Sequence, residues 1–339
     1  MRNTVIATAV VLSTALAPTA GPATAATGAP GTRSDPSCGA DNAAARTAGD
    51  PAPPASAPVG DAAETISYSL PAQLPIGMWS PSGLTLRTPA AKGTVRLDVT
   101  SSGFGTDSLA VQRYDTTTRK WVDLSTSPGR GSRPEHGAFT FPLTADASGA
   151  RPYTVALRMQ DLDRPGKVTV TASVDDGKGH TYRAPARTST ATRPEAAVTG
   201  WKPHAALRRG GPAGEFALTV RNTTDRAYPA LRAAYFAYGE GKGHSLAPKD
   251  LILQQYVPGK GWQRLPLAAG GCDPGLSATL RPAAPGPLAP GAAAAYRLRL
   301  AVAASAPRDV RSAEAGVSVS NGEQSFFSQQ LPFTLQNAK

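Results

Sequence analysis

The amino-acid sequence predicts an all-β protein that contains two copies of one β-sandwich domain. The chain has 339 residues, with 34 glycines and 32 prolines but only 6% aromatic residues, a composition that favours short strands and many turns over long helices. Segments that alternate apolar and polar residues, such as 66–70 (Ile-Ser-Tyr-Ser-Leu), indicate half-buried strands. A series of motifs also occurs twice in the same order, which predicts that two related domains share the length.

Residues 1–25 are predicted to be a secretion signal peptide that is cleaved near Ala25. Arg2 provides a positive start, Val5–Ala17 is mostly apolar, and residues 23–25 (Ala-Thr-Ala) have the small-x-small pattern of a cleavage site. The apolar stretch is too short and too polar for a transmembrane anchor, and Cys38 lacks the aliphatic residues of a lipobox before it. We therefore expect a secreted, extracellular protein with no membrane span after signal removal.

After the predicted signal peptide, the first segment of the chain is predicted to be disordered and the last segment is predicted to be a strand. Residues 26–62 are rich in Ala, Pro and Gly, so they cannot bury enough apolar surface to fold and are predicted to form a disordered tether. Residues 331–335 (Leu-Pro-Phe-Thr-Leu) approximate a sortase signal, but Leu stands where Gly is needed. This segment is predicted to be a final strand.

The repeat predicts β-sandwich domains at 63–190 and 195–337, with a linker around 188–193. In this alignment Trp79 corresponds to Trp201 and Trp121 to Trp262. Because aromatic rings dominate small β cores, these tryptophans are predicted to be core residues, and a sugar-stacking platform is the alternative. The matched segments, first copy before second, are 77–81 and 200–203, 93–99 and 214–220, 112–114 and 254–256, 153–157 and 296–300, and 165–168 and 307–310.

Two dipeptides predict hairpins within this pattern. Asp176-Gly177 and Asn321-Gly322 are strong hairpin signals because Gly, Asn and Asp tolerate the positive φ of tight turns.

The second copy is longer than the first between the 93–99/214–220 strand and the Gln-x-Tyr motif. We interpret residues 235–250 as an inserted strand and loop. Inserted loops at the ends of sandwiches often carry binding surfaces, whereas a hairpin tip without a ligand is the alternative. The candidate ligand-binding residues are Tyr235, Tyr238, Lys242, His244 and Lys249.

Cys38 and Cys272 are the only cysteines. An oxidising exterior favours a disulfide between them, and the alternative is two unpaired or intermolecular thiols. Two cysteines this far apart do not form a zinc site.

The formal charge of +11 predicts attraction to polyanions. Outside a cell, the expected partners are anionic cell-wall polymers or extracellular glycans. Nucleic acid is not expected, because the arginines are scattered and no recognition motif is present.

No catalytic set stands out, and neither a metal site nor a cofactor is expected. Residues 243–247 (Gly-His-Ser-Leu-Ala) approximate a nucleophile elbow, but no histidine follows Ser245, so the usual Ser-acid-His order cannot be completed. The four histidines, at 136, 180, 204 and 244, lack the short spacings of zinc ligands.

Two acidic pairs and one sequon each have turn formation as one interpretation. Residues 161/163 and 175/176 are aspartates that could face one another and bind calcium at Asp161 and Asp175, whereas turn formation is the alternative. Asn222-Thr223-Thr224 is a sequon that is predicted to cap a turn.

Residues 216–224 (Phe-Ala-Leu-Thr-Val-Arg-Asn-Thr-Thr) and 288–292 (Leu-Ala-Pro-Gly-Ala) carry a resemblance to a known class. They resemble adhesion-type immunoglobulin-like domains of secreted bacterial proteins, and the Ala/Pro/Gly/Arg bias resembles secreted proteins of high-GC actinobacteria. The resemblance implies two tandem immunoglobulin-like β-sandwiches and an extracellular binding or scaffolding role at the cell envelope. It implies no reaction, so we expect a non-enzymatic protein; the alternatives are a carbohydrate-binding module and a hydrolase with an unrecognised site.

Overall fold

The computed structural model describes residues 52–53, 58, 60, 63–87, 92–128, 134–144, 152–229, 231–270, 275–283, 286–322 and 324–337. The predicted signal peptide (1–25), most of the predicted tether, and both Cys38 and Cys272 lie outside these residues. Over the described part of the chain, no helix is long and apolar enough to cross a membrane.

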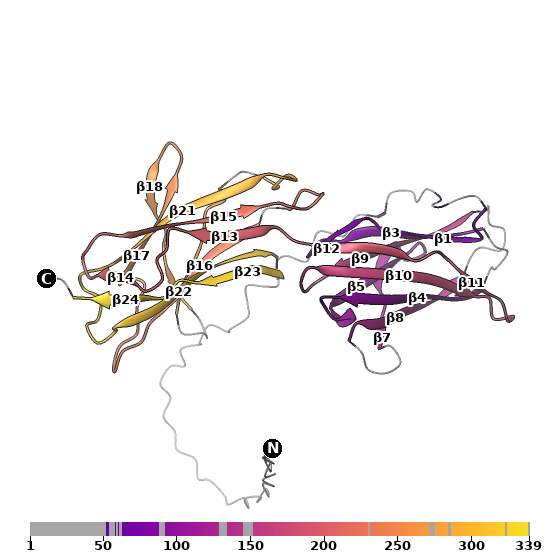
Figure 1. Cartoon of the computed structure of the whole chain (residues 1–339), viewed down its shortest axis with the longest axis horizontal. Coiled ribbons are helices and arrows are strands. Elements are labelled where there is room, and N and C mark those ends of the chain that lie inside the picture. The colour runs from indigo at the N-terminus through magenta and orange to yellow at the C-terminus, as the bar shows by residue number, and fades with distance from the viewer. Residues whose placement is uncertain are drawn as a thin grey trace, which may run out of the picture. The chain divides into compact units, whose positions relative to one another are not determined.

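The first repeat is a sandwich of two sheets (Figure 1). The five-stranded sheet has the order β1 (Ile66–Ser69), β3 (Ser80–Leu86), β9 (Tyr153–Asp161), β5 (Leu109–Asp115) and β6 (Lys120–Asp123). The other sheet has the order β2 (Gln73–Pro75), β12 (Arg187–Thr192), β10 (Gly166–Asp175), β4 (Lys92–Ser102), β8 (His136–Thr144) and β7 (Thr126–Pro128), with β11 (Thr181–Arg183) also on β10. A short 3-10 turn, η2 (Thr106–Ser108), precedes β5.

The second repeat has the same topology. One sheet has the order β13 (Glu195–Thr199), β15 (Gly214–Arg221), β21 (Ala293–Val302), β17 (Leu251–Val257) and β18 (Gly261–Arg264). The other has β14 (Ala205–Arg208), β24 (Phe333–Gln336), β22 (Ser312–Asn321), β16 (Arg232–Tyr238), β20 (Leu276–Thr279) and β19 (Ala268–Ala269), with β23 (Gln324–Gln330) on β22. In both repeats an early strand pairs in parallel with the last strand, β2 with β12 and β14 with β24. The described strands are two tandem immunoglobulin-like β-sandwiches, as the sequence predicts.

The topology corrects part of the sequence alignment. β4 corresponds to β16, so the counterpart of segment 93–99 lies in β16, while 214–220 lies in β15, the counterpart of β3. The second copy therefore has no inserted strand, and its extra residues lie in the loops on either side of β16. β15 and β16 have the same alternation of apolar and polar residues. Because the loops around β16 are longer than those around β4, this alternation alone could not show which of the two strands corresponds to β4. The registers also place Met159 at the position of Leu300, so 155–159, and not 153–157, matches 296–300.

Two further predictions can be compared with the strands. The sequence predicts the linker around 188–193, but residues 188–192 belong to β12. The segment between β12 and β13 is therefore only Arg193 and Pro194. Both predicted hairpins are confirmed, because β10 pairs with β11 and β22 with β23 across turns where Gly177 and Gly322 have φ of 69° and 60°.

Strand alternation builds each core. In β10, Val168, Val170, Ala172 and Val174 are all 0% exposed, and the residues between them face outward. Burying a Val or Leu side chain contributes about 1.5–3 kcal/mol. The two sheets of each sandwich are therefore held together mainly by their facing apolar side chains.

Two aromatic residues of the second repeat join the core of the first. Tyr228, in the loop before β16, and Phe326, in β23, belong to the hydrophobic cluster that contains Leu74 and Ile76. The rings of Tyr228 and Phe326 meet edge to face at 5.5 Å, and the Tyr228 hydroxyl donates to the Ile76 carbonyl at 2.9 Å. Burial raises the pKa of Tyr228. Residues of both repeats thus contribute to one packed cluster.

Candidate binding surfaces

A matched aromatic pair lies on the outer face of the five-stranded sheet in each repeat. Tyr114 of β5 is opposite Trp121 of β6, and Tyr256 of β17 is opposite Trp262 of β18. The rings meet edge to face at 5.3 Å in the first copy and 5.6 Å in the second. Because alternate residues of β5 and β17 fill the cores, these rings lie on the opposite, outward side of the sheet.

In each repeat, an arginine stacks on the tryptophan of the aromatic pair and donates a hydrogen bond to a glutamine. Arg158 of β9 lies 4.4 Å from the Trp121 ring centre, and Arg299 of β21 lies 4.5 Å from that of Trp262. The Arg158 Nε–H donates to Gln112 at 2.6 Å, and the Arg299 Nε–H donates to Gln254 at 2.7 Å. We call each set a Gln–Tyr–Trp–Arg cluster: Gln112, Tyr114, Trp121 and Arg158, then Gln254, Tyr256, Trp262 and Arg299.

The clusters revise the predicted role of the tryptophans. All four are half-buried rather than core residues. Trp121 and Trp262 occupy equivalent positions, as predicted, but Trp79 precedes β3 whereas Trp201 precedes β14, so these two are not equivalent. Only Trp201 packs against its core, on Phe216 and Phe333. The partial burial of Trp79, Trp121 and Trp262 has a physical reason, because a guanidinium stacks on each of these rings.

The tryptophan–arginine stack also bears on the carbohydrate-binding alternative. A sugar platform needs ring faces that are open to solvent, whereas one face of Trp121 and one face of Trp262 carry an arginine. The arginine of each Gln–Tyr–Trp–Arg cluster could not be identified from the repeated sequence motifs. It lies on a strand far from the Gln-x-Tyr motif in sequence, and only the pairing of β9 with β5, and of β21 with β17, reveals it.

The two clusters differ in charge. In the second copy, Arg297 lies 4.8 Å from the Tyr256 ring centre and is exposed, and Arg264 is exposed opposite Gln254. The registers put Ala156 and Asp123 at these two positions in the first copy. The outer sheet face is therefore cationic only in the second repeat.

The predicted ligand-binding residues are divided between core and surface. Tyr235 is 0% exposed and lies in the hydrophobic core of the second repeat, because its side chain is on the inward face of β16. The prediction that Tyr235 contacts a ligand at the surface is therefore corrected. Tyr238, at the end of the same strand, is half-buried, and its hydroxyl donates to the Glu240 carboxylate. Lys242, His244 and Lys249 are exposed on the 239–250 loop.

An open hollow of roughly 720 Å³ adjoins this loop. His244 Nδ1 lies 3.1 Å from the Asp309 carboxylate, to which the Gly243 N–H also donates at 3.1 Å. Partial burial acts to raise the pKa of Asp309, but these hydrogen bonds outweigh it and hold the pKa below its ordinary value. The hollow is lined by Lys242, Gly243, His244, Ser305, Pro307, Arg308 and Asp309.

A buried arginine holds in place the loop that contains Pro307, Arg308 and Asp309, which also lines the hollow. Arg209 is 5% exposed, and its Nη2 donates to the carbonyls of Pro307 at 2.7 Å and Val310 at 2.6 Å. Its Nε–H donates to the Ala306 carbonyl at 3.1 Å. Hydrogen bonds from a charged donor are about twice as strong as neutral ones, so Arg209 fixes the backbone that carries Arg308.

The two aspartate pairs that were candidates for calcium binding do not meet. Asp161 ends β9, beside the start of β10, whereas Asp175 ends β10 at the opposite end of the sandwich. Asp175 and Asp176 instead accept backbone N–H groups of the turn, from Gly177 and Lys178, each at 2.8 Å. Within the described ranges, no group of three or more His, Cys, Asp or Glu side chains is placed to hold a metal ion.

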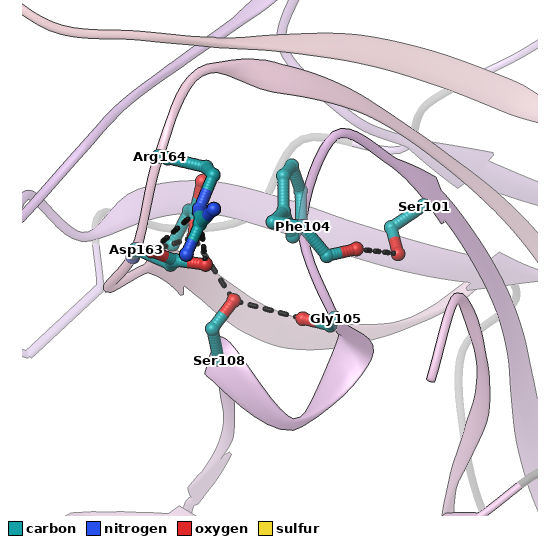
Figure 2. Close-up of polar contacts among 7 residues, drawn as sticks. Ser101, Phe104, Gly105, Ser108, Asp163 and Arg164 are labelled. Atoms are coloured by element: carbon teal, nitrogen blue, oxygen red, sulfur yellow. Dashed lines mark hydrogen bonds and ion pairs between the residues drawn. The ribbon is translucent and has the colours of Figure 1, made fainter. Parts of the chain in front are cut away.

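Asp161 lies in a small polar network next to η2 with Ser108 and Asp163, two residues that Figure 2 labels. One of its oxygens accepts the Ser108 hydroxyl at 3.2 Å and the Asp163 N–H at 3.0 Å, while Oδ2 is buried without a hydrogen-bond partner. Figure 2 also shows Asp163 paired with Arg164, at 2.9 Å. Burial is the main cause that raises the pKa of Asp161 to about 6.

The sequon forms a turn, as predicted. Asn222 is 0% exposed, and its side-chain oxygen accepts the N–H of Thr224 at 3.0 Å. Its amide group donates to the Leu288 carbonyl at 2.8 Å. The side chain is therefore fully used in joining two loops.

Comparison with known proteins gives no family for this chain. No family model and no curated protein sequence matches it. Among solved structures, the C-terminal domain of the Streptococcus pyogenes antigen I/II-family protein AspA has a TM-score of 0.41 at 8% identity, covering 80% of this chain and 99% of that one. The C-terminal domain of the Streptococcus agalactiae AgI/II polypeptide BspA has a TM-score of 0.36 at 9% identity, with 80% and 99% covered. A partial N-terminal region of an enterococcal surface protein has a TM-score of 0.26 at 8% identity, with 79% and 92% covered. These likenesses are weak.

Proposed function

We propose that this chain is a secreted, non-enzymatic binding or scaffolding protein that is retained at the bacterial envelope by anionic polymers. The observation that carries the proposal is the cationic hollow of the second repeat, where Lys242, His244 and Arg308 surround an open surface. The chain has a formal charge of +11, which adds a long-range attraction to the same ligands.

The local charges favour an anion at the hollow. Asp309 is the acidic residue of its lining, and its carboxylate already accepts the Gly243 N–H and contacts His244. Lys242 and Arg308 have no carboxylate partner among the described residues. Their charges are therefore available to a ligand, and because they are exposed, salt will screen them over about 8 Å at physiological ionic strength.

Retention on purified cell walls tests the proposal. The protein without residues 1–25 is loaded at low salt onto walls, and onto walls stripped of their anionic polymers, and is then eluted with a salt gradient. We expect retention on intact walls only, with elution at moderate salt. Absence of retention on intact walls at low salt contradicts the proposal.

A charge-matched pair of variants locates the surface. The double substitution Lys242→Gln and Arg308→Gln removes the two free cations of the hollow and is expected to lower the eluting salt concentration. The control, Lys178→Gln with Arg183→Gln, removes the same charge from exposed positions of the first repeat and is expected to have a smaller effect. Equal shifts in both would show that net charge, and not this hollow, is responsible.

A further inference from the structure

The two Gln–Tyr–Trp–Arg clusters differ in what covers the arginine. Ser80 pairs with Met159 and Gly214 pairs with Leu300. Met159 and Leu300 are equivalent, because they pair with Val111 and Leu253 of the matched strands β5 and β17. The residue before Ser80 is Trp79 and the residue before Gly214 is Ala213, so alanine occupies in the second copy the place that tryptophan occupies in the first.

This replacement changes the exposure of the cation. In the first copy Trp79 and Trp121 both lie against the guanidinium of Arg158, at 4.3 Å and 4.4 Å, and the residue is only 7% exposed. In the second copy Trp262 is the ring that contacts Arg299, and Arg299 is half-buried. The methyl group of Ala213 cannot replace an indole, so the side of Arg299 that corresponds to Trp79 has no indole over it.

We infer that this side of Arg299 binds an aromatic side chain of a partner polypeptide, in the place that Trp79 occupies in the first repeat. The site is preorganised, because Gln254 accepts the Arg299 Nε–H at 2.7 Å and Trp262 supports its other face. A planar guanidinium stacks well on an aromatic ring. The first copy therefore displays the bound arrangement with its own tryptophan.

The surrounding charges specify the partner further. Arg297 and Arg264 are exposed beside the cluster, so acidic residues next to the aromatic residue are favoured. Glu215 lies directly opposite Arg299, and its carboxylate can accept an indole N–H or a phenol O–H from the stacked ring. We therefore assign the site to an acidic polypeptide segment with Trp or Tyr, and binding of a nucleic acid, whose bases could also stack, is the competing outcome of the test.

The undescribed residues of this sequence do not provide the aromatic ring. All residues outside the described ranges are non-aromatic, so no such segment of this chain can supply the ring. The partner is thus an extracellular polypeptide that presents Trp or Tyr among acidic residues.

Substitution Ala213→Trp tests the inference, because it supplies to the second copy the ring that the first copy has. The probes are the fluorescein-labelled peptides Glu-Asp-Trp-Asp-Glu and Glu-Asp-Ala-Asp-Glu, and an oligothymidylate of equal charge, titrated by fluorescence anisotropy. We expect the wild-type protein to bind the Trp peptide about tenfold more tightly than the Ala peptide. The peptide with Trp should also shift the ¹⁵Nε resonance of Arg299, and Ala213→Trp should abolish both the preference and the shift.

Two further variants keep the result interpretable. Arg299→Lys retains the charge but loses the planar stack, so it should reduce the preference even if Ala213→Trp folds poorly. Trp79→Ala, the control in the first copy, should leave the preference unchanged, because Ala156 and Asp123 replace the arginines there. Equal affinity for both peptides, an unaltered preference in Ala213→Trp and Arg299→Lys, or tighter binding of the oligothymidylate would each overturn the inference. Wall retention depends on Lys242 and Arg308, so the two proposals can fail separately.

Discussion

At the scale of single residues, Asp161 shows how one position can take opposite chemistry in two copies of a fold. Leu109 pairs with Asp161 in the first repeat, and its counterpart Leu251 pairs with Val302 in the second. Both Asp161 and Val302 are buried. A carboxylate in an apolar setting favours its neutral form, so the raised pKa of Asp161 follows from its position.

Substitution Asp161→Asn is expected to flatten the pH dependence of stability. The pKa of Asp161 is about 6 in the folded protein against an ordinary 3.8, so folding favours the protonated acid. This contribution is complete below pH 4 and is lost as the pH rises through 6. The difference in free energy of unfolding between Asp161→Asn and wild type should therefore grow by about 1–3 kcal/mol from pH 4 to pH 7.

Urea denaturation at pH 4, 5, 6 and 7 measures this change. Asp176→Asn is the control with the opposite sign: the Lys178 N–H is the main cause that lowers the pKa of Asp176 below 3.8, so any loss of stability relative to wild type is nearly complete by pH 5, and the difference should stay level from pH 5 to pH 7. Parallel stability curves for Asp161→Asn and wild type would contradict the assignment to Asp161.

At the scale of elements, the outer face of β22 depends on a glycine. A Cβ added at Gly316 would lie 2.1 Å from Cζ of Phe236, on the neighbouring strand β16, and 2.8 Å from the backbone oxygen of Gln329 in β23. The Phe236 ring therefore covers the site where a side chain would otherwise stand. This close approach explains why glycine, a poor strand former, occupies a central strand.

Substitution Gly316→Ala should therefore destabilise the second repeat. The added methyl group must displace the ring and the β23 backbone, at a cost of about 1–3 kcal/mol. Chemical denaturation should show a lower midpoint with an unchanged slope. Gly243→Ala is the matched control, because nothing lies within 4 Å of its Cβ position, and it should change stability by less than about 0.5 kcal/mol. Equal midpoints for the two variants would contradict this account.

At the scale of the whole molecule, the second repeat contributes to the stability of the first. Besides the Tyr228 ring, Arg226 donates to the Trp79 carbonyl at 3.1 Å and to the Ser80 hydroxyl at 2.7 Å. Asn321 donates to the Gly77 carbonyl at 3.0 Å. These bonds reach the segment that connects β2 and β3 and the first residue of β3, so a change in the second repeat should affect this part of the first repeat.

Substitution Tyr228→Ala should destabilise the first repeat, although Tyr228 follows it in sequence. Removing a buried aromatic ring costs about 3–5 kcal/mol, and the Ile76 carbonyl loses its donor. Hydrogen exchange should become faster at the amides of Ile76 and Gly77, which bond to the Thr192 and Asp161 carbonyls. Tyr256→Ala, which removes a half-buried ring from the outer face, should leave the exchange at these amides unchanged; unchanged exchange in Tyr228→Ala would contradict the coupling.

The sequence by itself determined the all-β class, the duplication, both hairpins and the Trp121/Trp262 equivalence. These features depend on interactions between residues close together in the chain: alternation along a strand, glycine at a turn, and the two-strand unit that joins Gln-x-Tyr to Trp. The burial of Tyr235 follows the same alternation once β16 is recognised as an ordinary strand.

Only the tertiary structure decided which residues from distant strands share a surface. Arg158 and Arg299 reach their tryptophans across β9 and β21, the equivalence of Trp79 with Ala213 follows from strand register, and Arg209 meets its carbonyl partners through the folding of a later loop. No local pattern encodes such contacts, because strand order and register are settled by the packing of whole sheets. For this reason the candidate surfaces lie on sheet faces and loop clusters that the linear motifs only partly indicated.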